Sequence, residues 1–336
     1  MPSTIKDIAK DTGLSLATIS KFLNGKPISK ENKIIIEKSI EKLGYVPNKA
    51  AQALRSKKTK TICILLPKAG DYFWGQVCTY IEEYLQDYHY SVMVRAYSDQ
   101  PVDFVKERDS ILNTSMDGII IIPYSAKAIP LFNAIEESNI PFVFLDQEVY
   151  GIEADVVTSN NCEAAYRATK YLLEKGHRRI GVIVGELFLS TLQKRVDGFN
   201  KACDEYGISE ADRIVMGGEF KMEMGLKLFG KMMRLRERPT AVFFLGHDLT
   251  LGAIMEASEL RLKIPEDISV ISFDDDEIFH AFFPPITAIA QNYRRIGRET
   301  VELIMKRIGG DRETYPERKE IDAVFLERES VKNLDT

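Results

Sequence analysis

The chain has 336 residues, of which 45% are hydrophobic, and it carries a formal net charge of −5. This composition is ordinary for a soluble globular protein, and the length is sufficient for two or three domains. No apolar run approaches the roughly 20 residues of a membrane span, and no secretory signal follows the first methionine, so we expect a cytoplasmic protein that does not contact a membrane. The four cysteines form no C-x-x-C pair and the four histidines are scattered, which predicts reduced thiols, no metal site and no cofactor.

The charge is unevenly distributed along the chain. Residues 1–60 hold 13 Lys and Arg against five Asp and Glu, a balance of +8, so the remainder of the chain has a balance of −13. This segregation is typical of a small nucleic-acid-binding segment joined to a larger body with a different task.

The basic segment opens with two short helix patterns separated by a tight turn. Thr4 and Asp7 form a capping box, Gly13 suits the left-handed residue that ends a helix, and Ser15 can cap the next helix. This arrangement predicts a helix-turn-helix, whose second helix enters the major groove of DNA and exposes residues 16–18, 20 and 21 to it. The alternative is a helical bundle with incidental charge.

A third helix is expected from Ser29 to about Leu43. Its apolar side chains are expected to pack on the first two helices, namely Ile34, Ile35, Ile36, Ile40 and Leu43. Pro47 ends the helical region, and the alanine-rich segment 49–56 is too short to form a stable helix alone. Leu54 is a large apolar side chain that nothing in the local sequence can bury, and it can wedge between base steps of the minor groove. A plain interdomain linker is the alternative.

The pattern T-I-x-D-I-A-x-x-x-G-x-S-x-A-T-I-S-x-x-L-N-G from Thr4, followed by L-G-Y-x-P-N and A-x-x-L, resembles the lac-repressor/galactose-repressor (LacI/GalR) family. The resemblance implies a homodimer on a palindromic double-stranded DNA operator, with paired hinge helices that become ordered on DNA and Leu54 at the central step. Lys21 stands where many relatives carry Arg, which weakens the case for a bidentate base contact. The predicted DNA-binding residues are Thr4, Ser15, Leu16, Ala17, Thr18, Ser20, Lys21, Asn24, Tyr45, Asn48, Ala51, Leu54 and Arg55.

Beyond Lys60, short continuous hydrophobic runs alternate with helical stretches. Continuous runs predict strands covered on both faces, hence parallel sheets built from repeated βαβ units. The runs lie at 61–66, 91–94, 118–122, 141–145, 180–184, 241–245 and 268–273. The first run is not followed by a glycine-rich phosphate loop, so a nucleotide-dependent enzyme is unsupported.

Motifs of the body, among them Lys175–Ile180, Arg195–Phe199 and Ile264–Asp274, resemble the effector domain of the same family. The resemblance implies two Rossmann-like subdomains, as in periplasmic binding proteins, with ligand in the cleft between them and three crossovers near 158–161, 289–292 and 319–323. The expected domains are a small all-α helix-turn-helix domain at 1–46, a hinge helix and linker at 47–60, and an α/β effector-binding and dimerisation domain at 61–336. Within the latter, the N-subdomain takes about 61–160 plus 291–320, and the C-subdomain about 161–290.

Ligands of open α/β sheets bind at the carboxyl ends of strands. The family pattern places these residues at the cleft: Asp71, Phe73, Trp74, Asn160, Thr191, Arg195, Phe220, His247, Asp248, Asp274, Gln291 and Tyr293. Polar members such as Arg195 and Asp274 can bind vicinal hydroxyls, and flat rings such as Trp74 can cover the C–H face of a sugar. Two alternatives stay open: residues 73 and 74 can be core at the start of a helix, and Asp248 and Asp274 can be helix caps.

Departures from the family pattern bear on the effector. Ser159 stands where relatives often have Asp, and Gln291-Asn292-Tyr293 replaces the frequent Gln-Pro. An Arg that relatives carry near Leu189 is also absent. Together these departures favour a neutral carbohydrate over a purine or a strongly anionic ligand. The sequence therefore predicts a non-enzymatic transcriptional regulator, a repressor of carbohydrate-use genes controlled by a sugar-like effector. The alternatives are a solute-binding protein of a sugar transporter, which the basic segment argues against, and an enzyme, for which no nucleophile–base set is found.

Overall fold

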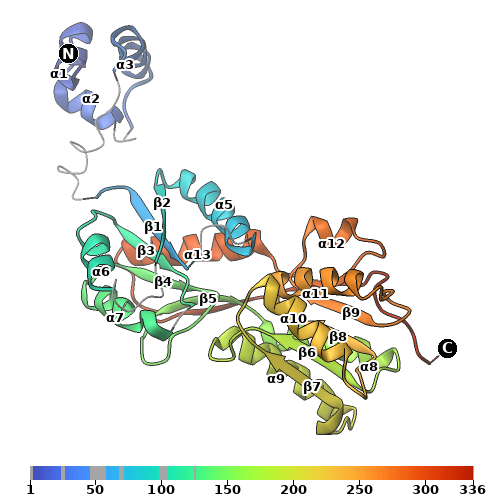
Figure 1. Ribbon diagram of the computed structural model, residues 1–336. Helices are drawn as coiled ribbons and strands as arrows, with labels where there is room; N and C mark the ends of the chain where they lie inside the picture. The colour runs from blue at the N-terminus through green and yellow to red at the C-terminus, as the bar shows by residue number, and fades with distance from the viewer. Residues whose placement is uncertain are drawn as a thin grey trace. The chain divides into compact units, whose positions relative to one another are not determined.

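The structure is a computed structural model, and it describes residues 3–23, 27–45, 58–67, 72–97, 104–124 and 126–335 (Figure 1). The chain divides into two compact units, Met1–Lys60 and Thr61–Thr336. Most of the expected hinge segment, including Asn48, Ala51, Leu54 and Arg55, lies outside the described residues, as do Asn24 and Asp71.

The first unit contains α1 (Ile5–Thr12), α2 (Leu16–Leu23) and α3 (Lys30–Leu43). The predicted capping is confirmed: the Asp7 carboxylate accepts hydrogen bonds from the amide (2.8 Å) and hydroxyl (2.7 Å) of Thr4. Gly13 ends α1 with φ +70°, and the Ser15 hydroxyl accepts from the amide of Thr18. Two helices joined by this turn form the helix-turn-helix that the spacing predicts.

The core of this unit contains one fully buried side chain from each helix, namely Ile8, Ile19 and Ile36. The expectation that Ile34 and Ile35 pack there is wrong, because their exposed fractions are 52% and 37%. Side chains four residues apart share a helix face, so Ile36 and Ile40 point to the core. Residues 34 and 35 lie on other faces of the helix and point to solvent.

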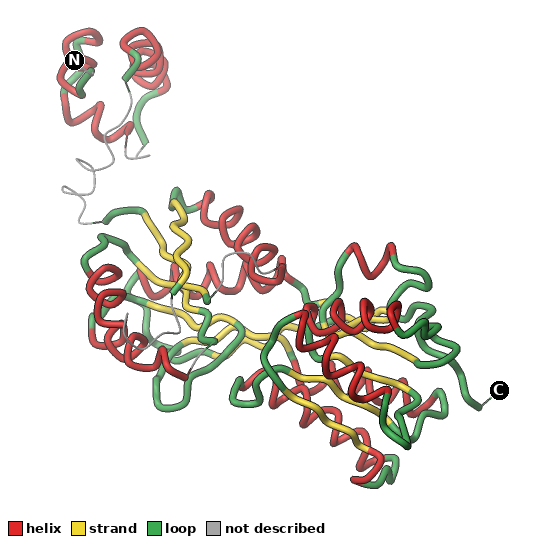
Figure 2. The backbone as a smooth tube through the Cα atoms, in the orientation of Figure 1, coloured by secondary structure: helices red, strands yellow, loops and turns green. Residues whose placement is uncertain are grey.

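The second unit holds two six-stranded sheets, each covered by helices on both faces (Figures 1 and 2). The first has the order β11-β5-β4-β3-β1-β2 and the second the order β12-β10-β9-β8-β6-β7. All neighbours are parallel except β10 and β12. The predicted α/β class with two Rossmann-like subdomains is confirmed.

The elements of the first sheet come from both ends of the unit. Its strands are β1 (Thr61–Leu66), β2 (Ser91–Ala96), β3 (Gly118–Ile121), β4 (Phe142–Leu145), β5 (Asp155–Ser159) and β11 (Arg318–Ile321). Its helices are α5 (Tyr72–Asp87), α6 (Phe104–Leu112), α7 (Ile129–Glu137) and α13 (Tyr293–Ile308). Alternate residues of β1 explain the continuous hydrophobic run: Ile62 and Ile64 pack with α5 and α13, whereas Cys63 and Leu65 pack with α7.

The second sheet is built in the same way. Its strands are β6 (Ile180–Val184), β7 (Arg213–Gly217), β8 (Ala241–Phe244), β9 (Ser269–Phe273), β10 (Thr287–Ala290) and β12 (Val324–Leu326). Its helices are α8 (Asn161–Glu174), α9 (Ser190–Glu205), α10 (Met222–Met233), α11 (His247–Glu259) and the short α12 (Glu277–Ala281). Val182 packs with α8 and α9, and its neighbour Ile183 packs with α10 and α11.

The chain passes between the sheets three times, after β5, after β10 and after β11. Polar side chains bind these crossings to one another. Ser159 donates a hydrogen bond from the first crossing to the amide oxygen of Gln291 in the second. Asn160 donates to Asp322 (3.0 Å) and accepts from the amide of Ala323 (2.9 Å), which ties the first crossing to the third.

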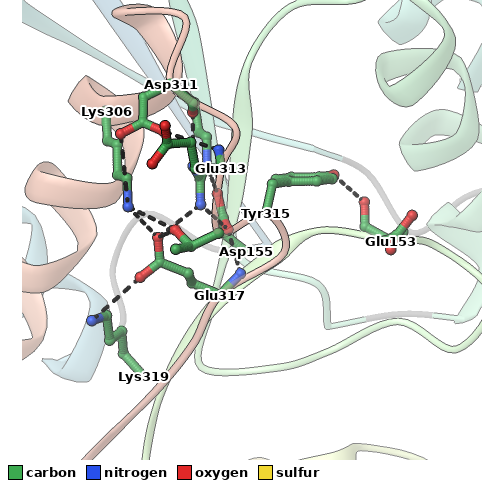
Figure 3. Close-up of polar contacts among 10 residues, drawn as sticks. Glu153, Asp155, Lys306, Asp311, Glu313, Tyr315, Glu317 and Lys319 are labelled. Atoms are coloured by element: carbon green, nitrogen blue, oxygen red, sulfur yellow. Dashed lines mark hydrogen bonds and ion pairs between the residues drawn. The ribbon is translucent and has the colours of Figure 1, made fainter.

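A buried ion-pair network anchors the end of α13 to the first sheet (Figure 3). The Arg307 side chain is 2% exposed and donates two hydrogen bonds to Asp155, at 2.7 and 2.9 Å. Glu317 accepts from Arg307 at 3.0 Å and from Lys306 at 2.6 Å. Figure 3 shows Glu317 reached by Lys306 on one side and by Lys319 on the other. Such a pair is costly to break, since one partner would be left buried and charged.

This network predicts an acid-dependent loss of stability. Hydrogen bonds from Lys306 and Thr314 lower the pKa of Glu317 from 4.5 to about 2. A carboxylate with a lowered pKa stabilises the fold above its ordinary pKa, and this contribution disappears as the pH falls from 4.5 to 2. We expect Glu317→Gln to lower the free energy of unfolding at pH 7 by about 1–3 kcal/mol, with the difference from wild type vanishing near pH 2.

Urea denaturation at several pH values measures this difference. Glu313→Gln, which changes an exposed carboxylate of the same loop, is the matched control and should leave the stability unchanged. A Glu317→Gln deficit that stays constant down to pH 2 would contradict the assignment.

Candidate functional site

The α2 helix presents an exposed surface opposite its buried Ile19. Ser15, Leu16, Ala17 and Lys21 are exposed, with Leu16 at 45%. Thr18 and Ser20 are half-buried, and the Thr18 hydroxyl lies 3.0 Å from that of Ser15. A helix that exposes small polar side chains and a lysine can enter a DNA groove, where these side chains contact base edges and phosphates.

The other described DNA-binding candidates of this unit have roles within the protein. The Thr4 hydroxyl donates to Asp7, and the half-buried Tyr45 packs against the three-helix core. Asp11 joins α1 to α3 by accepting from Lys42 at 2.6 Å and Ser39 at 2.7 Å, and these two hydrogen bonds lower its pKa. These contacts stabilise the start of α1 and its packing on α3, and they do not belong to the exposed surface of α2.

In the second unit, a cavity of about 480 Å³, including space open to solvent, lies where the carboxyl ends of strands from both sheets meet. Its lining, which combines apolar and aromatic side chains with several polar ones, is typical of a small-molecule site. The described residues that line it are Phe73, Trp74, Tyr124, Asp146, Gln147, Leu189, Thr191, Leu192, Arg195, Phe220, His247, Asp274 and Gln291.

The structure brings most of the predicted cleft residues together at this cavity. The predicted residues that line it are Phe73, Trp74, Thr191, Arg195, Phe220, His247, Asp274 and Gln291. Three others lie close by but do not line it. Asn160 forms hydrogen bonds with Asp322 and Ala323 at the third crossing. Asp248 binds His247. The ring of Tyr293 lies edge-on to that of Phe73, with 5.5 Å between the ring centres.

Sequence reasoning missed Tyr124, Asp146, Gln147 and two leucines. Tyr124 follows the hydrophobic run 118–122, and Asp146 and Gln147 follow the run 141–145 directly. The carboxyl ends of parallel strands share one edge of a sheet, so the same rule that located the predicted set could have found these residues.

Arg195 is the most buried cation of the cavity, with 4% of its surface exposed. Its Nε donates to Asn161 at 2.8 Å and its Nη1 to the Leu245 carbonyl at 2.9 Å, while the guanidinium lies 3.5 Å from the centre of the Phe273 ring. Burial lowers the pKa of Arg195, but an arginine remains protonated in a folded protein. None of the described residues accepts a hydrogen bond from Nη2, which leaves this nitrogen for a ligand.

Asp274 has an unusual backbone conformation, and its carboxylate accepts a hydrogen bond from one side-chain amide. Its φ is +80°, a conformation that a non-glycine residue rarely adopts and that often marks a functional position. Gln291 donates to one Asp274 oxygen at 2.5 Å. The alternative that Asp274 caps the next helix is not what the structure shows, because Asp276 accepts from Ile278 at the start of α12.

Gln147 connects the two sides of the cavity. Its side-chain oxygen accepts from the Ser190 hydroxyl at 3.0 Å and the Thr191 amide at 3.1 Å, and its nitrogen donates to the Thr191 hydroxyl. The adjacent Glu148 accepts from Lys194 at 2.9 Å. These contacts run from the end of β4 to the start of α9 and therefore span the cleft.

The described part of the chain contains no helix long and apolar enough to cross a membrane. Among the same residues, no three His, Cys, Asp or Glu side chains gather into a group that could hold a metal ion.

Two family descriptions match different parts of the chain. Residues 4–48 match the bacterial regulatory proteins of the lacI family, and residues 169–331 match the periplasmic binding protein-like domain. The chain is 31% identical over 335 residues to the HTH-type transcriptional repressor PurR of Histophilus somni (strain 2336), covering 99% of this chain and 100% of that protein. It is 29% identical over 337 residues to the repressor of the same name from Actinobacillus pleuropneumoniae serotype 3 (strain JL03), covering 99% of each.

Solved structures of regulators share the fold. The lac repressor dimer bound to operator and the anti-inducer ONPF has a TM-score of 0.83 at 22% identity, covering 99% of this chain and 100% of that one. A complex of the regulator CelR with cellobiose has a TM-score of 0.74 at 23% identity, covering 98% and 99%. A regulator from Enterococcus faecium with bound ribose has a TM-score of 0.74 at 24% identity, covering 82% and 99%.

The contacts of Arg195 predict that it supports the fold as well as the cavity. Arg195→Ala would leave the Asn161 side chain and the Leu245 carbonyl buried without their donor, so we expect the free energy of unfolding to fall by about 2–4 kcal/mol. Urea denaturation measures the loss. Arg294→Ala, which removes an exposed guanidinium on α13, should change stability by less than about 0.5 kcal/mol. Equal small losses in both variants would show that the Arg195 contacts contribute little to stability.

Proposed function

The chain belongs to the LacI family of bacterial regulatory proteins as a DNA-binding transcriptional repressor, and we propose that a small, neutral, hydroxyl-rich effector, a sugar or sugar derivative, controls it from the cleft. The observation that carries the proposal is the cavity itself, which combines two carboxylates, one unused guanidinium nitrogen and several aromatic rings. The competing function, a solute-binding protein of a sugar transporter, is not favoured because a lacI-family domain occupies residues 4–48.

The DNA side of the proposal rests on the first unit. A homodimer would place two copies of α2 in successive major grooves of a palindromic operator, with Ser15, Ala17 and Lys21 at the base edges and phosphates. The lac repressor, which matches the chain along almost its full length, binds its operator as a dimer. The positive balance of residues 1–60 supplies the attraction to phosphate, and the hinge segment with Leu54 would insert at the centre of the site.

The cavity's side chains define which ligand groups they can bind. Asp146 and Asp274 can only accept hydrogen bonds when ionised, whereas Arg195 Nη2 can only donate. A hydroxyl group can serve both kinds of partner, and Trp74 and Phe220 offer apolar faces for ring C–H groups. An anionic ligand is disfavoured, because it would meet two negatively charged carboxylates and only one guanidinium nitrogen that can donate to it. Two regulators of the same fold hold cellobiose and ribose, which also supports a sugar.

Effector control follows from binding that spans the cleft. The ligand would touch Asp146 on one side and Arg195 and Asp274 on the other, so it would stabilise the closed arrangement that Gln147 also bridges. A ligand shifts a conformational equilibrium by the difference between its affinities for the two states. A change in the closure of the cleft would alter how the dimer presents its two copies of residues 1–60 to the operator.

The DNA-binding proposal predicts that residues 61–336 alone do not bind a palindromic operator. The full chain should bind it with an affinity that falls steeply with salt, because basic side chains displace counterions from the phosphates. A gel-shift or anisotropy titration at two salt concentrations measures this. Operator binding by residues 61–336 as tight as that of the full chain would overturn the assignment.

The effector proposal predicts a response of Trp74, the single tryptophan, which is 6% exposed and lines the cavity. Titration of the full chain with neutral sugars, their phosphates and free nucleobases should change its emission with a neutral sugar. The corresponding sugar phosphate should bind at least about tenfold more weakly, which is about 1.4 kcal/mol. Arg195→Lys, which keeps the charge but loses the planar fork, should lose about tenfold or more in sugar affinity. A response to nucleobases or phosphates alone would replace the sugar assignment.

A further inference from the structure

The histidine at the start of α11 is held between two carboxylates. Its Nδ1 lies 3.1 Å from Asp248 and its Nε2 lies 2.6 Å from Asp276, and His247 is only 9% exposed. A neutral imidazole donates from one nitrogen and presents a lone pair at the other. Because a lone pair facing a carboxylate is repulsive, two carboxylate partners favour the doubly protonated imidazolium.

The carboxylates around the imidazole favour its protonated form. Burial opposes the charge, but the hydrogen bonds to Asp248 and Asp276 outweigh it and raise the pKa of His247 above its ordinary value. Asp274 adds to this effect. Asp275 is paired with Arg328 at 2.7 Å. The Tyr72 hydroxyl stays neutral, since burial and these carboxylates raise its pKa.

The faces of the imidazole are covered by aromatic rings from different parts of the unit. Phe279 of α12 covers it at 5.3 Å, within the half built on the second sheet. Tyr72 is the first residue of α5, which packs on the first sheet, and its ring stacks on His247 at 5.1 Å with an angle of 13°. Among the partners described here, Tyr72 is the one that reaches His247 from across the cleft.

The ring nitrogens of His247 are therefore both taken by the protein. The imidazole lines the cavity but offers an effector no N–H group, so it cannot be a hydrogen-bonding residue of the ligand site in this arrangement. Its contact with Tyr72 links the two halves instead, which makes both side chains positioning residues.

We propose that Tyr72 and His247 form a latch that holds the cleft closed while His247 is protonated, so that effector response depends on pH. The inference rests on the proposed function, in which closure of this cleft controls DNA binding. With His247 protonated, the cluster with Asp248 and Asp276 has a charge of −1; with His247 neutral, it has a charge of −2. Covering the larger charge with Tyr72 costs more desolvation, and the cation is attracted to the tyrosine face more strongly than the neutral ring is. The latch thus operates at low and neutral pH and is released as the pH rises through the pKa of His247.

Acrylamide quenching of Trp74 in the full chain, without effector, tests the latch. Trp74 lies two residues from Tyr72 and lines the same cavity, so opening of the cleft exposes it to the quencher. Between pH 6 and pH 9 we expect the ratio of open to closed protein to rise about three- to tenfold, the effect of losing one such cation–ring contact. In His247→Gln, which is neutral at every pH, quenching should be high and independent of pH.

Further variants separate the latch from a general loss of structure. Tyr72→Leu should abolish the pH dependence, whereas Tyr72→Phe, which keeps the ring, should retain it. His280→Gln changes an exposed histidine on α12 and should behave as wild type. If His247→Gln fails to fold, the Tyr72 pair still decides the question.

Wild-type quenching that does not change with pH, or a pH dependence that survives in Tyr72→Leu, would overturn the proposal. A sugar panel without any response would instead refute the proposed effector. The two failures are distinguishable because the quenching experiment contains no effector.

Discussion

The cleft exists because three chain crossings hold two mostly parallel sheets together at the carboxyl ends of their parallel strands. Hydrogen bonds between the crossings fix their positions: Ser159 reaches Gln291, and Asn160 reaches Asp322 and Ala323. Gln291 then continues the chain of contacts by donating to Asp274 inside the cavity. An effector bound to Asp274, as proposed, would therefore be connected through the side-chain amide of Gln291 to the crossings between the two halves. Buried polar groups in such a chain must all keep partners, so the crossings have few alternative arrangements.

The contacts that span the cleft differ in their chemistry. Gln147 uses neutral hydrogen bonds to Ser190 and Thr191, and Tyr72 uses its ring face against His247. Tyr124 and Phe220 meet edge to face at 6.3 Å. Each contact is small compared with the cores behind it, which are formed by buried side chains of the strands and helices. Contacts this small allow the opening without unfolding that the proposed effector control requires.

Arg195 and Arg307 show two different uses of a buried guanidinium. Arg307 is matched by Asp155 and Glu317 and anchors α13, the helix that follows the second crossing. Arg195 has no carboxylate hydrogen-bonded to it among the described residues; it donates to an amide oxygen and a backbone carbonyl and rests on Phe273. Of these two arginines, Arg195 is the one with a spare nitrogen at a cavity wall, which the proposed binding of a ligand oxygen requires.

The sequence by itself determined the architecture. Continuous hydrophobic runs predicted strands covered on both faces, and caps such as Thr4–Asp7 and Gly13 predicted the helix-turn-helix, because these signals depend on neighbouring residues alone. The carboxyl ends of the runs and the family pattern also located Arg195, Asp274 and their neighbours at the cleft. Tertiary structure decided which way each side chain turns. Asn160 and Asp248 lie at the predicted edge but bind protein partners, and Ile34 and Ile35 face solvent. It also decided that His247 meets Tyr72, which is 175 positions away in the sequence. Such pairings depend on how the two sheets approach one another, and no local pattern of residues encodes that approach.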